Sequence, residues 1–338
     1  MQTAGGFAAF RRLNRRRVLI LTYHRFAETE IEGRVSAAQF SAHLEFLKAN
    51  YRVLPLAEIV ENLREGKSLP DNAVAITIDD GYKDVYDVAF PVLKQFQIPA
   101  TVFVITDFLD RKCWLWTDKA RVLAANTKLA EIEFENRKFD LNGAVSRKSL
   151  AAKINEHLKR LPDEEKEKRL EDLQSAFAVD LTELPAPEFS AINWNEAKEM
   201  DANGVAIESH TVAHPILTNV SDERLRFELI ESKRRLSEIL GREANLFCYP
   251  NGGFNERSKK FAAEAAYKAA VTTEIGFNDF DSDLFALKRT DAQPAMIDFE
   301  QYASGFELAK TSLRKLSQYR ERQRPGFAHL PGRYRSRY

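Results

Sequence analysis

Two adjacent carboxylates, Asp79 and Asp80, close an otherwise apolar run in the segment AVAITIDDGYKD, which covers residues 73–84. Two neighbouring carboxylates repel each other strongly if both are charged and buried, so a cation is expected to hold them. A turn that ends in Asp-Gly would explain the same letters without any chemistry. An Asp-x-Asp motif for phosphoryl transfer is disfavoured, because Ile78 stands two residues before Asp80.

A pair of histidines, His210 and His214, follows a second apolar run in the segment VAIESHTVAHP. A spacing of four residues places both rings on one face of a helical turn or of an extended segment. Two neutral imidazoles with one carboxylate form an open metal site that leaves positions for water and a substrate oxygen. Such a pair alone is more often accidental, but a carboxylate pair at another strand end weakens that interpretation. One aspartate would ligate the cation, and the other would remain free as a base.

Two further polar clusters also follow apolar runs. His24 ends the run VLILTY, and a structural histidine bonded to a neighbouring loop is the alternative interpretation. The segment LFCYPNGGFN ends another run, and its Gly252 and Gly253 would let the backbone approach a ligand closely. A simple strand-ending turn is the alternative there.

The elements that would position these groups alternate between short β-branched runs and longer amphipathic stretches, the pattern of β/α units around a parallel sheet. The apolar runs predict strands at residues 18–23, 52–56, 73–78, 100–105, 205–209, 245–250 and 267–273. The intervening stretches predict helices at residues 37–50, 56–64, 85–96 and 193–204, and one that begins after an N-cap at Ser221 and ends at Leu240. About seven such units favour a closed barrel over an open sheet. In either design, functional side chains gather at the carboxyl ends of the strands, where all four polar clusters fall.

The regular pattern is interrupted between about residues 110 and 190, which indicates an insertion. Trp114 and Trp116 in this stretch could stack on sugar rings, and core packing is an equal alternative. Arginines cluster in residues 1–17 and again in residues 319–338, where an Arg-rich stretch with two prolines predicts a loose tail. These basic ends could associate peripherally with an anionic membrane surface, although solubility explains them as well.

The composition of the 338-residue chain limits its possible partners and its cellular location. Fifty basic and fifty acidic side chains cancel, so no global charge selects nucleic acid as a partner. Two cysteines are too few for a disulfide scaffold and suit a reducing compartment. No apolar stretch approaches the roughly 18–20 residues of a membrane-spanning helix. Together these features predict a cytoplasmic location, with peripheral association at the inner membrane face as an extension.

The two motifs, in their order, resemble those of the polysaccharide deacetylase family, also called the NodB-homology or carbohydrate esterase family 4. TIDDG at residues 77–81 resembles the first family motif, Thr-Phe-Asp-Asp-Gly, and HTVAH at residues 210–214 resembles the second, His-Ser/Thr-x-x-His. The resemblance covers Val18 to about Asp291, apart from the insertion. It implies an α/β fold, a distorted (β/α)7 TIM-like barrel in a domain of residues 18–318. It also implies an enzyme that removes an N-acyl group, usually acetyl, from an amino sugar in an exopolysaccharide or a lipid-linked glycan precursor of the cell envelope.

The resemblance also assigns roles to residues. Asp80, His210 and His214 would bind a divalent metal, usually Zn²⁺, and Asp79 would be the general base. Thr211 would brace the histidine loop by a hydrogen bond.

The segment YPNG would match the third family motif, which supplies substrate and oxyanion contacts. Its members here are Tyr249, Gly252 and above all the backbone amide of Asn251. The third motif normally begins with an arginine that orients the base, but Cys248 stands in that position.

A late Leu-x-His motif that supplies a general acid is also not visible, because the only histidine after His214 is His329. A branch of the family that acts on exopolysaccharide hexosamines lacks that histidine and begins with a Tyr-His motif. The segment TYHRF resembles it, and His24 would then be the acid.

Two other functions stay open at this point. One is a hydrolase of C–N bonds in small cyclic amides or imides, as in some relatives of the superfamily. The other is a catalytically inactive carbohydrate-binding or scaffold module, which the complete set of two aspartates and two histidines counts against. The sequence does not fix the acyl group or the oligomeric state.

Overall fold

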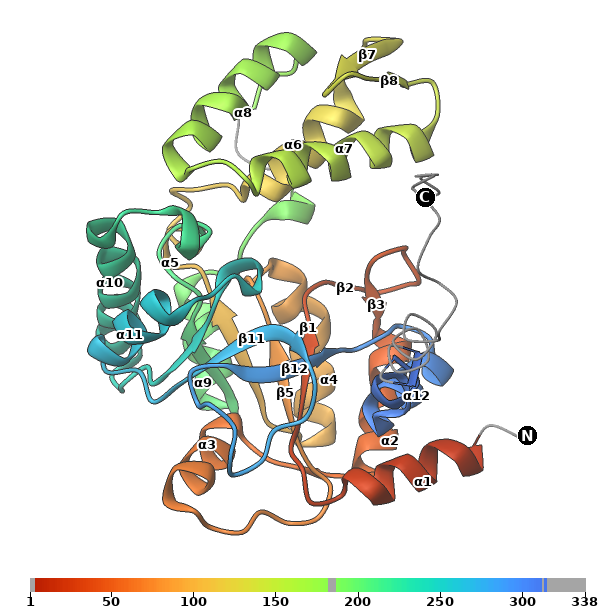
Figure 1. Ribbon diagram of the computed structural model, residues 1–338, viewed down its shortest axis with the longest axis vertical. Coiled ribbons are helices and arrows are strands. Elements are labelled where there is room, and N and C mark those ends of the chain that lie inside the picture. Colours follow the sequence, from red (N-terminus) through yellow and green to blue (C-terminus); the bar gives the residue numbers. More distant parts are fainter. Residues whose placement is uncertain (1–3, 182–186, 312, 315–338) are drawn as a thin grey trace, which may run out of the picture.

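The structure, a computed structural model, describes residues 4–181, 187–311 and 313–314. Its centre is a closed barrel of seven parallel strands, in which β12 at the end of the series pairs back with β1 (Figure 1). Around the barrel the strands are β1 (Leu19–Tyr23), β5 (Ala73–Ile78), β6 (Ala100–Val104), β9 (Val205–Ser209), β10 (Leu246–Cys248), β11 (Ala269–Ile275) and β12 (Leu287–Asp291). The short strand β4 (Arg52–Val53) pairs with the start of β5. The predicted barrel is therefore confirmed, but its last strand, β12, was not among the predicted strands.

Helices surround the barrel, and five of them follow the predicted amphipathic stretches, whereas the helices at residues 106–109, 256–264 and 296–304 were not predicted. The helices are α2 (Ala37–Asn50), α3 (Leu56–Glu65), the π-helical turn Val85–Ala89 that continues as α4 (Phe90–Phe96), α5 (Thr106–Leu109), α9 (Trp194–Ala202), α10 (Asp222–Leu240), α11 (Glu256–Glu264) and α12 (Met296–Ser304). The predicted N-cap Ser221 accepts a hydrogen bond from the Arg224 amide. Shorter elements are the parallel pair β2 (Phe26–Ala27) and β3 (Val35–Ser36), and the 3-10 turns Pro187–Phe189, Leu217–Asn219 and Pro250–Gly252.

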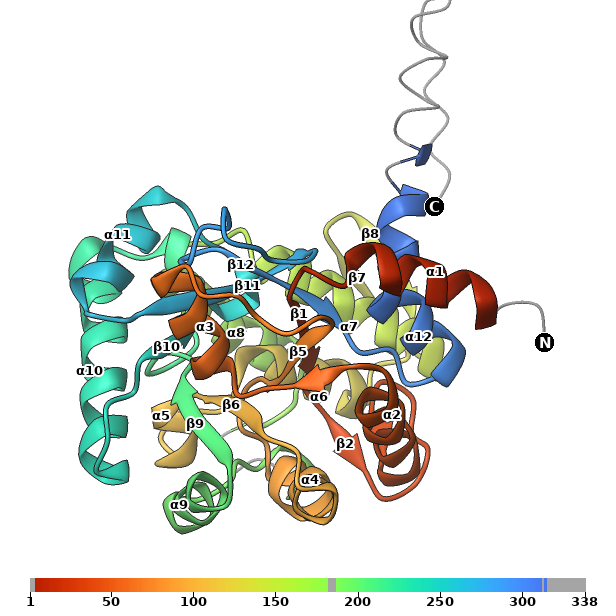
Figure 2. The ribbon, with the colours of Figure 1, turned by 90° about the horizontal axis from the view of Figure 1, so that it is seen from below.

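The amino-terminal end of the barrel is filled by apolar side chains. Helix α3 lies across this end, as Figure 2 shows from below. Its Ile59 and Val60 share one cluster with Ala75, Phe103 and Val271 of the strands. Burial of this kind excludes water from the lower part of the barrel, so the polar chemistry is left to the opposite, carboxyl-terminal end.

The interruption between residues 110 and 190 is a helical unit at the carboxyl-terminal end of the barrel, at the top of Figure 1. It consists of α6 (Trp116–Asn126), the antiparallel hairpin β7 (Glu131–Phe134) and β8 (Arg137–Asp140), α7 (Ala144–Leu158) and α8 (Asp163–Phe177). Its helices enclose an apolar cluster of their own, which also takes in Ile216 from the barrel. Trp116 belongs to that cluster and is 2% exposed, so core packing, and not sugar stacking, accounts for it.

The N-terminal residues form a helix, α1 (Ala4–Asn14), which packs against the chain that follows α12. The rings of Phe7 and Phe10 meet the ring of Phe306 edge to face at 5.4 and 5.2 Å. The apolar side of this basic segment is therefore used within the molecule. In the part of the chain that the structure describes, no helix is both long and apolar enough to cross a membrane. The predicted tail, residues 319–338, lies outside the described residues.

Candidate active site

The tight turn after β5 carries the two aspartates. Asp80 adopts a left-handed φ of 74° and Gly81 one of 79°, conformations that aspartate tolerates and glycine prefers. A Cβ on Gly81 would lie 2.9 Å from Cγ1 of Val104, so only glycine fits there. The turn directs the two neighbouring carboxylates to different partners, Asp79 to Arg289 and Asp80 to the two histidines.

The loop after β9 carries the two histidines and is also strained. Thr211 and His214 have φ values of 73° and 59°, and such positions cost about 1–3 kcal/mol each in a non-glycine residue. The Thr211 hydroxyl oxygen accepts a hydrogen bond from the His214 amide at 3.0 Å. The contact is the brace that the family resemblance implies.

Three potential ligand atoms converge at the mouth of the barrel. Oδ1 of Asp80 lies 3.5 Å from Nε2 of His210 and 3.7 Å from Nε2 of His214. These distances are too long for good hydrogen bonds. They match the spacing of about 3.4 Å between ligands in a tetrahedral site with metal bonds near 2.1 Å.

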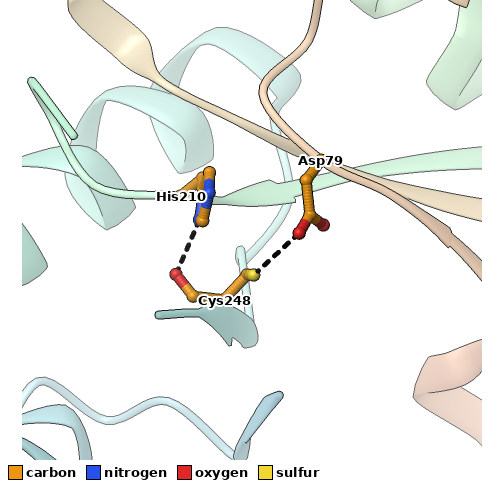
Figure 3. A group of neighbouring side chains, drawn as sticks. All are labelled: Asp79, His210 and Cys248. Atoms are coloured by element: carbon orange, nitrogen blue, oxygen red, sulfur yellow. Dashed lines mark hydrogen bonds between the residues drawn. The ribbon is translucent and has the colours of Figure 1, made fainter. Parts of the chain in front are cut away.

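The surroundings of the two rings suit metal binding. Nδ1 of His210 donates to the backbone carbonyl of Cys248 at 2.7 Å (Figure 3), so Nε2 is the atom that faces Asp80. Such an outer hydrogen bond from a ligating histidine is usual at metal sites. Burial acts to lower the pKa of His210, but Cys248 and Asp80 outweigh it and raise that pKa well above its usual range, so without a metal a proton lies between Nε2 and Asp80. Burial lowers the pKa of His214 to about 3, so that ring is neutral. A divalent cation would replace the proton that His210 shares with Asp80.

The other carboxylate, Asp79, is held by a buried arginine on β12. Arg289 donates to both oxygens of Asp79 at 2.7 Å, and it is 2% exposed. Its Nε donates to the Thr272 carbonyl at 2.8 Å, and Nη1 donates to the Thr77 hydroxyl at 3.1 Å. Burial acts to raise the pKa of Asp79, but the charge and the hydrogen bonds of Arg289 outweigh it and hold that pKa well below its usual range. Asp79 is therefore ionised at neutral pH.

A second group of potential ligands consists of Asp79, His210 and Cys248 (Figure 3). The Cys248 thiol is 3.5 Å from Oδ2 of Asp79, and Nη2 of Arg289 is 3.2 Å from its sulfur. Burial raises the pKa of this thiol, so it is protonated, whereas a metal binds the thiolate. The guanidinium already supplies the positive charge in this group. The donor set of Asp80, His210 and His214 fits a metal better.

His24 stands at the end of β1, beside the base. Its Nε2 is 3.6 Å from Oδ2 of Asp79, and its side chain is 47% exposed. The ring is thus placed between the buried carboxylate and solvent.

In the segment after β10, two of the predicted substrate contacts, Tyr249 and Gly252, are occupied by packing and hydrogen bonding within the protein. The side chain of Tyr249 is buried, and its hydroxyl donates to the Phe285 carbonyl at 3.0 Å, so it offers no free group to a substrate. A Cβ on Gly252 would lie 1.9 Å from Oγ1 of Thr273, so that glycine is required by packing on β11. Asn251 has a φ of 55°, and its Nδ2 is buried with no hydrogen-bond partner in the part of the chain that the structure describes.

The inserted helical unit contacts both motif loops. The Tyr82 hydroxyl, two residues after Asp80, donates to the fully buried Asp118 at 2.5 Å. The Trp116 indole donates to the His214 carbonyl at 3.4 Å. The insertion is thus part of the support of the site.

Sequence reasoning missed Arg289, although it noted that an arginine beside the base was lacking. The position expected for it holds Cys248, and the cation comes instead from a strand two places further round the barrel. In LKRTD, Leu287 and Arg289 alternate with exposed residues and share the buried face of the strand. From the sequence alone, however, a charged residue at such a position is predicted to be exposed to solvent.

Known proteins resemble this chain in sequence. A family model described as polysaccharide deacetylase matches residues 66–270, more than half of the chain. The chain is 26% identical over 278 residues to the protein YxkH of Bacillus subtilis strain 168, a match that covers 82% of this chain and 72% of that protein. It is 33% identical over 126 residues to a poly-beta-1,6-N-acetyl-D-glucosamine N-deacetylase of Staphylococcus aureus, covering 36% of this chain and 43% of that protein.

A solved structure shares the fold. The deacetylase PplD of Streptococcus pyogenes, solved in complex with acetate, superposes with a TM-score of 0.57 at 21% identity, covering 84% of this chain and 96% of that chain. At this level of identity the likeness concerns the fold, a barrel of the same kind.

Proposed function

Because the chain belongs to the polysaccharide deacetylase family, we propose that it is a metal-dependent hydrolase that removes an N-acetyl group from an amino sugar in a polysaccharide. The reaction breaks the amide C–N bond with water and yields acetate and a free sugar amine. One observation carries the proposal: Oδ1 of Asp80 faces Nε2 of His210 at 3.5 Å and Nε2 of His214 at 3.7 Å, beside a second, ionised carboxylate.

The proposed substrate is a chain of β-1,6-linked N-acetylglucosamine. The Staphylococcus aureus relative carries that substrate in its name. The Tyr23-His24 pair at the end of β1 is the feature that resembles the exopolysaccharide branch of the family.

Asp80, His210 and His214 would hold the metal, and two imidazoles with one carboxylate suit zinc. When bound there, such an ion lowers the pKa of water and polarises a carbonyl group. The hydrogen bond to Cys248 keeps a proton on Nδ1 of His210, which leaves Nε2 for the metal, and burial keeps His214 neutral.

Asp79 is the proposed general base. Arg289 fixes both of its oxygens and keeps it ionised, so that it can accept a proton from the attacking water. His24 is the proposed general acid, because it lies beside Asp79 and reaches solvent, where the leaving sugar amine must take up a proton. The backbone amide of Asn251 is proposed to donate to the oxyanion, a contact typically worth about 3–4 kcal/mol in the barrier.

The basic N-terminal residues lie far from this site. Arg16 and Arg17 precede β1 and His24 follows it, and five strand residues span about 16 Å. A membrane surface that these arginines bound would face the end of the barrel opposite His24. A polysaccharide chain free in solution is therefore favoured over a glycan anchored in that membrane.

The test uses the full chain purified with zinc. We expect about one zinc ion per chain and acetate release from a β-1,6-linked N-acetylglucosamine oligomer, lost on chelation and restored by Zn²⁺. Hydrolysis of a small cyclic imide without acetate release from any N-acetylated sugar would overturn the proposal.

A further inference from the structure

A buried carboxylate outside the site holds the loop between the two histidines. Glu228 lies on α10 and is 0% exposed. Its Oε2 accepts hydrogen bonds from the amides of Val212 at 2.7 Å and Ala213 at 3.0 Å. These two residues stand between His210 and His214, so Glu228 acts on the backbone that carries both rings.

The loop has a conformation that needs such a partner. Thr211, with its left-handed φ of 73°, turns the following N–H groups toward the same side. Successive amides after a left-handed residue form a concavity that binds an anion. A β-branched residue rarely adopts this conformation, and it persists where the surroundings fix it. Here these N–H groups converge on one acceptor, the Oε2 oxygen of Glu228.

The other side of the loop is held as well. The carbonyls of Thr211 and Val212 accept hydrogen bonds from the amides of Thr106 at 3.2 Å and Asp107 at 2.9 Å, at the start of α5. The peptide groups after His210 are thus fixed between α5 and Glu228. Loss of the Glu228 contact would leave one side free, and the strained turn could then relax.

The position of Glu228 on the apolar face of α10 also indicates that its carboxylate has a structural role. Leu225, Leu229 and Leu236 form the buried face of α10, and Glu228 lies on that same face. A charged residue on an apolar stripe costs folding energy unless its partners compensate for it. Its other oxygen, Oε1, lies 2.6 Å from Nη2 of Arg224, whose side chain is 43% exposed.

We propose that Glu228 is a positioning residue of the candidate metal centre, which sets the distance between the two histidine rings through the Val212 and Ala213 amides. The proposal rests on the proposed function, because its effect is on metal binding. Glu228 touches neither the ligand atoms nor the substrate.

Two substitutions separate the reach of the side chain from its charge. Glu228→Gln keeps an oxygen at the same distance from the amides and removes the charge. Glu228→Asp keeps the charge and withdraws the oxygens by one methylene. We expect Glu228→Gln to bind Zn²⁺ within about threefold of wild type, and Glu228→Asp to bind it 10–100-fold more weakly, the usual effect of losing an outer contact at a metal site.

The measurement is the Zn²⁺ dissociation constant, obtained by competition with a chromophoric chelator in the absence of substrate. Asp201→Ala is the matched control, because Asp201 also accepts from a backbone amide, that of Ile207 at 3.0 Å, and pairs with Arg242. This control is expected to bind Zn²⁺ as wild type does.

Wild-type affinity in Glu228→Asp, a loss larger in Glu228→Gln than in Glu228→Asp, or an equal loss in Asp201→Ala would overturn the proposal. Should Glu228→Asp not fold, Glu228→Gln decides alone: a loss above tenfold overturns the proposal, and retained affinity with slow exchange of the Val212 and Ala213 amides supports it. Absence of zinc binding in wild type would instead refute the proposed function.

Discussion

Replacing Arg289 by methionine is expected to destabilise the protein by about 3–5 kcal/mol at neutral pH, the typical cost of removing one partner of a buried ion pair. The hydrogen bonds of Arg289 indicate a loss of stability of the same size. Arg289 makes two hydrogen bonds of 2.7 Å to Asp79, and hydrogen bonds to charged groups contribute about 1.5–3 kcal/mol each. Methionine fills most of the volume, so the loss reports chiefly on the carboxylate that stays buried without a counter-charge.

The assay is urea unfolding of the metal-free protein. The double variant Asp79→Asn with Arg289→Met removes the stranded charge, so it should recover at least half of the lost stability. Arg257→Met is the control, because the Arg257 side chain is 32% exposed, its partner Asp222 is 64% exposed, and solvent screens this pair; a smaller loss is expected. A loss below about 1 kcal/mol in Arg289→Met, or no recovery in the double variant, would refute the reasoning.

The pH dependence of this effect has a definite sign. Arg289 holds the pKa of Asp79 below its ordinary value of 3.8, so the stabilisation by the pair is present above about pH 4 and is lost as the pH falls further. Without Arg289, burial is the largest influence on Asp79 and raises its pKa against the smaller effects of His24 and His210, so the folded variant loses stability as the pH rises above about 4. The difference between wild type and Arg289→Met should therefore widen from about pH 4 upward.

Three further predictions concern single side chains. Asp79→Asn should abolish acetate release and leave zinc bound, whereas His210→Ala should lose both; equal zinc content in His210→Ala and wild type would contradict the ligand assignment. His24→Gln should retain zinc and lower kcat by about 10²–10⁴-fold, and an unchanged kcat argues against the acid role. Burial lowers the pKa of His43 from 6.5 to about 4, so the unfolded chain takes up a proton first as the pH falls from 6.5 to 4. Wild type should lose about 3 kcal/mol of stability over that interval, and a His43→Gln variant with the same slope would exclude His43 as the cause.

The strand ends and the residues on them were accessible from the sequence. Asp79, Asp80, His210 and His214 each follow an apolar run, and a parallel barrel brings the carboxyl ends of its strands to one rim. This rule predicts which side chains share the rim without predicting the distances between them. The structure supplies those distances and places Asp80 within 3.7 Å of both histidine rings.

The supporting groups were not accessible in the same way. Arg289 and Glu228 are single charges on buried faces. The partner of Arg289, Asp79, is 210 residues away in the chain, and the Val212 and Ala213 amides are 16 and 15 residues away from Glu228. The apolar pattern around each charge marks it as unusual, but it does not show which group the charge contacts. The strand β12 was missed because three of its five residues, LKRTD, are charged.

The central claim is that Asp80, His210 and His214 share one cation. Anomalous diffraction at the zinc edge from crystals of the zinc-loaded protein tests it directly. We predict one ion at about 2.0–2.2 Å from Oδ1 of Asp80 and from Nε2 of each histidine. An ion bound instead by the Cys248 sulfur and Asp79, or an empty position between the three ligands at saturating zinc, would contradict the account.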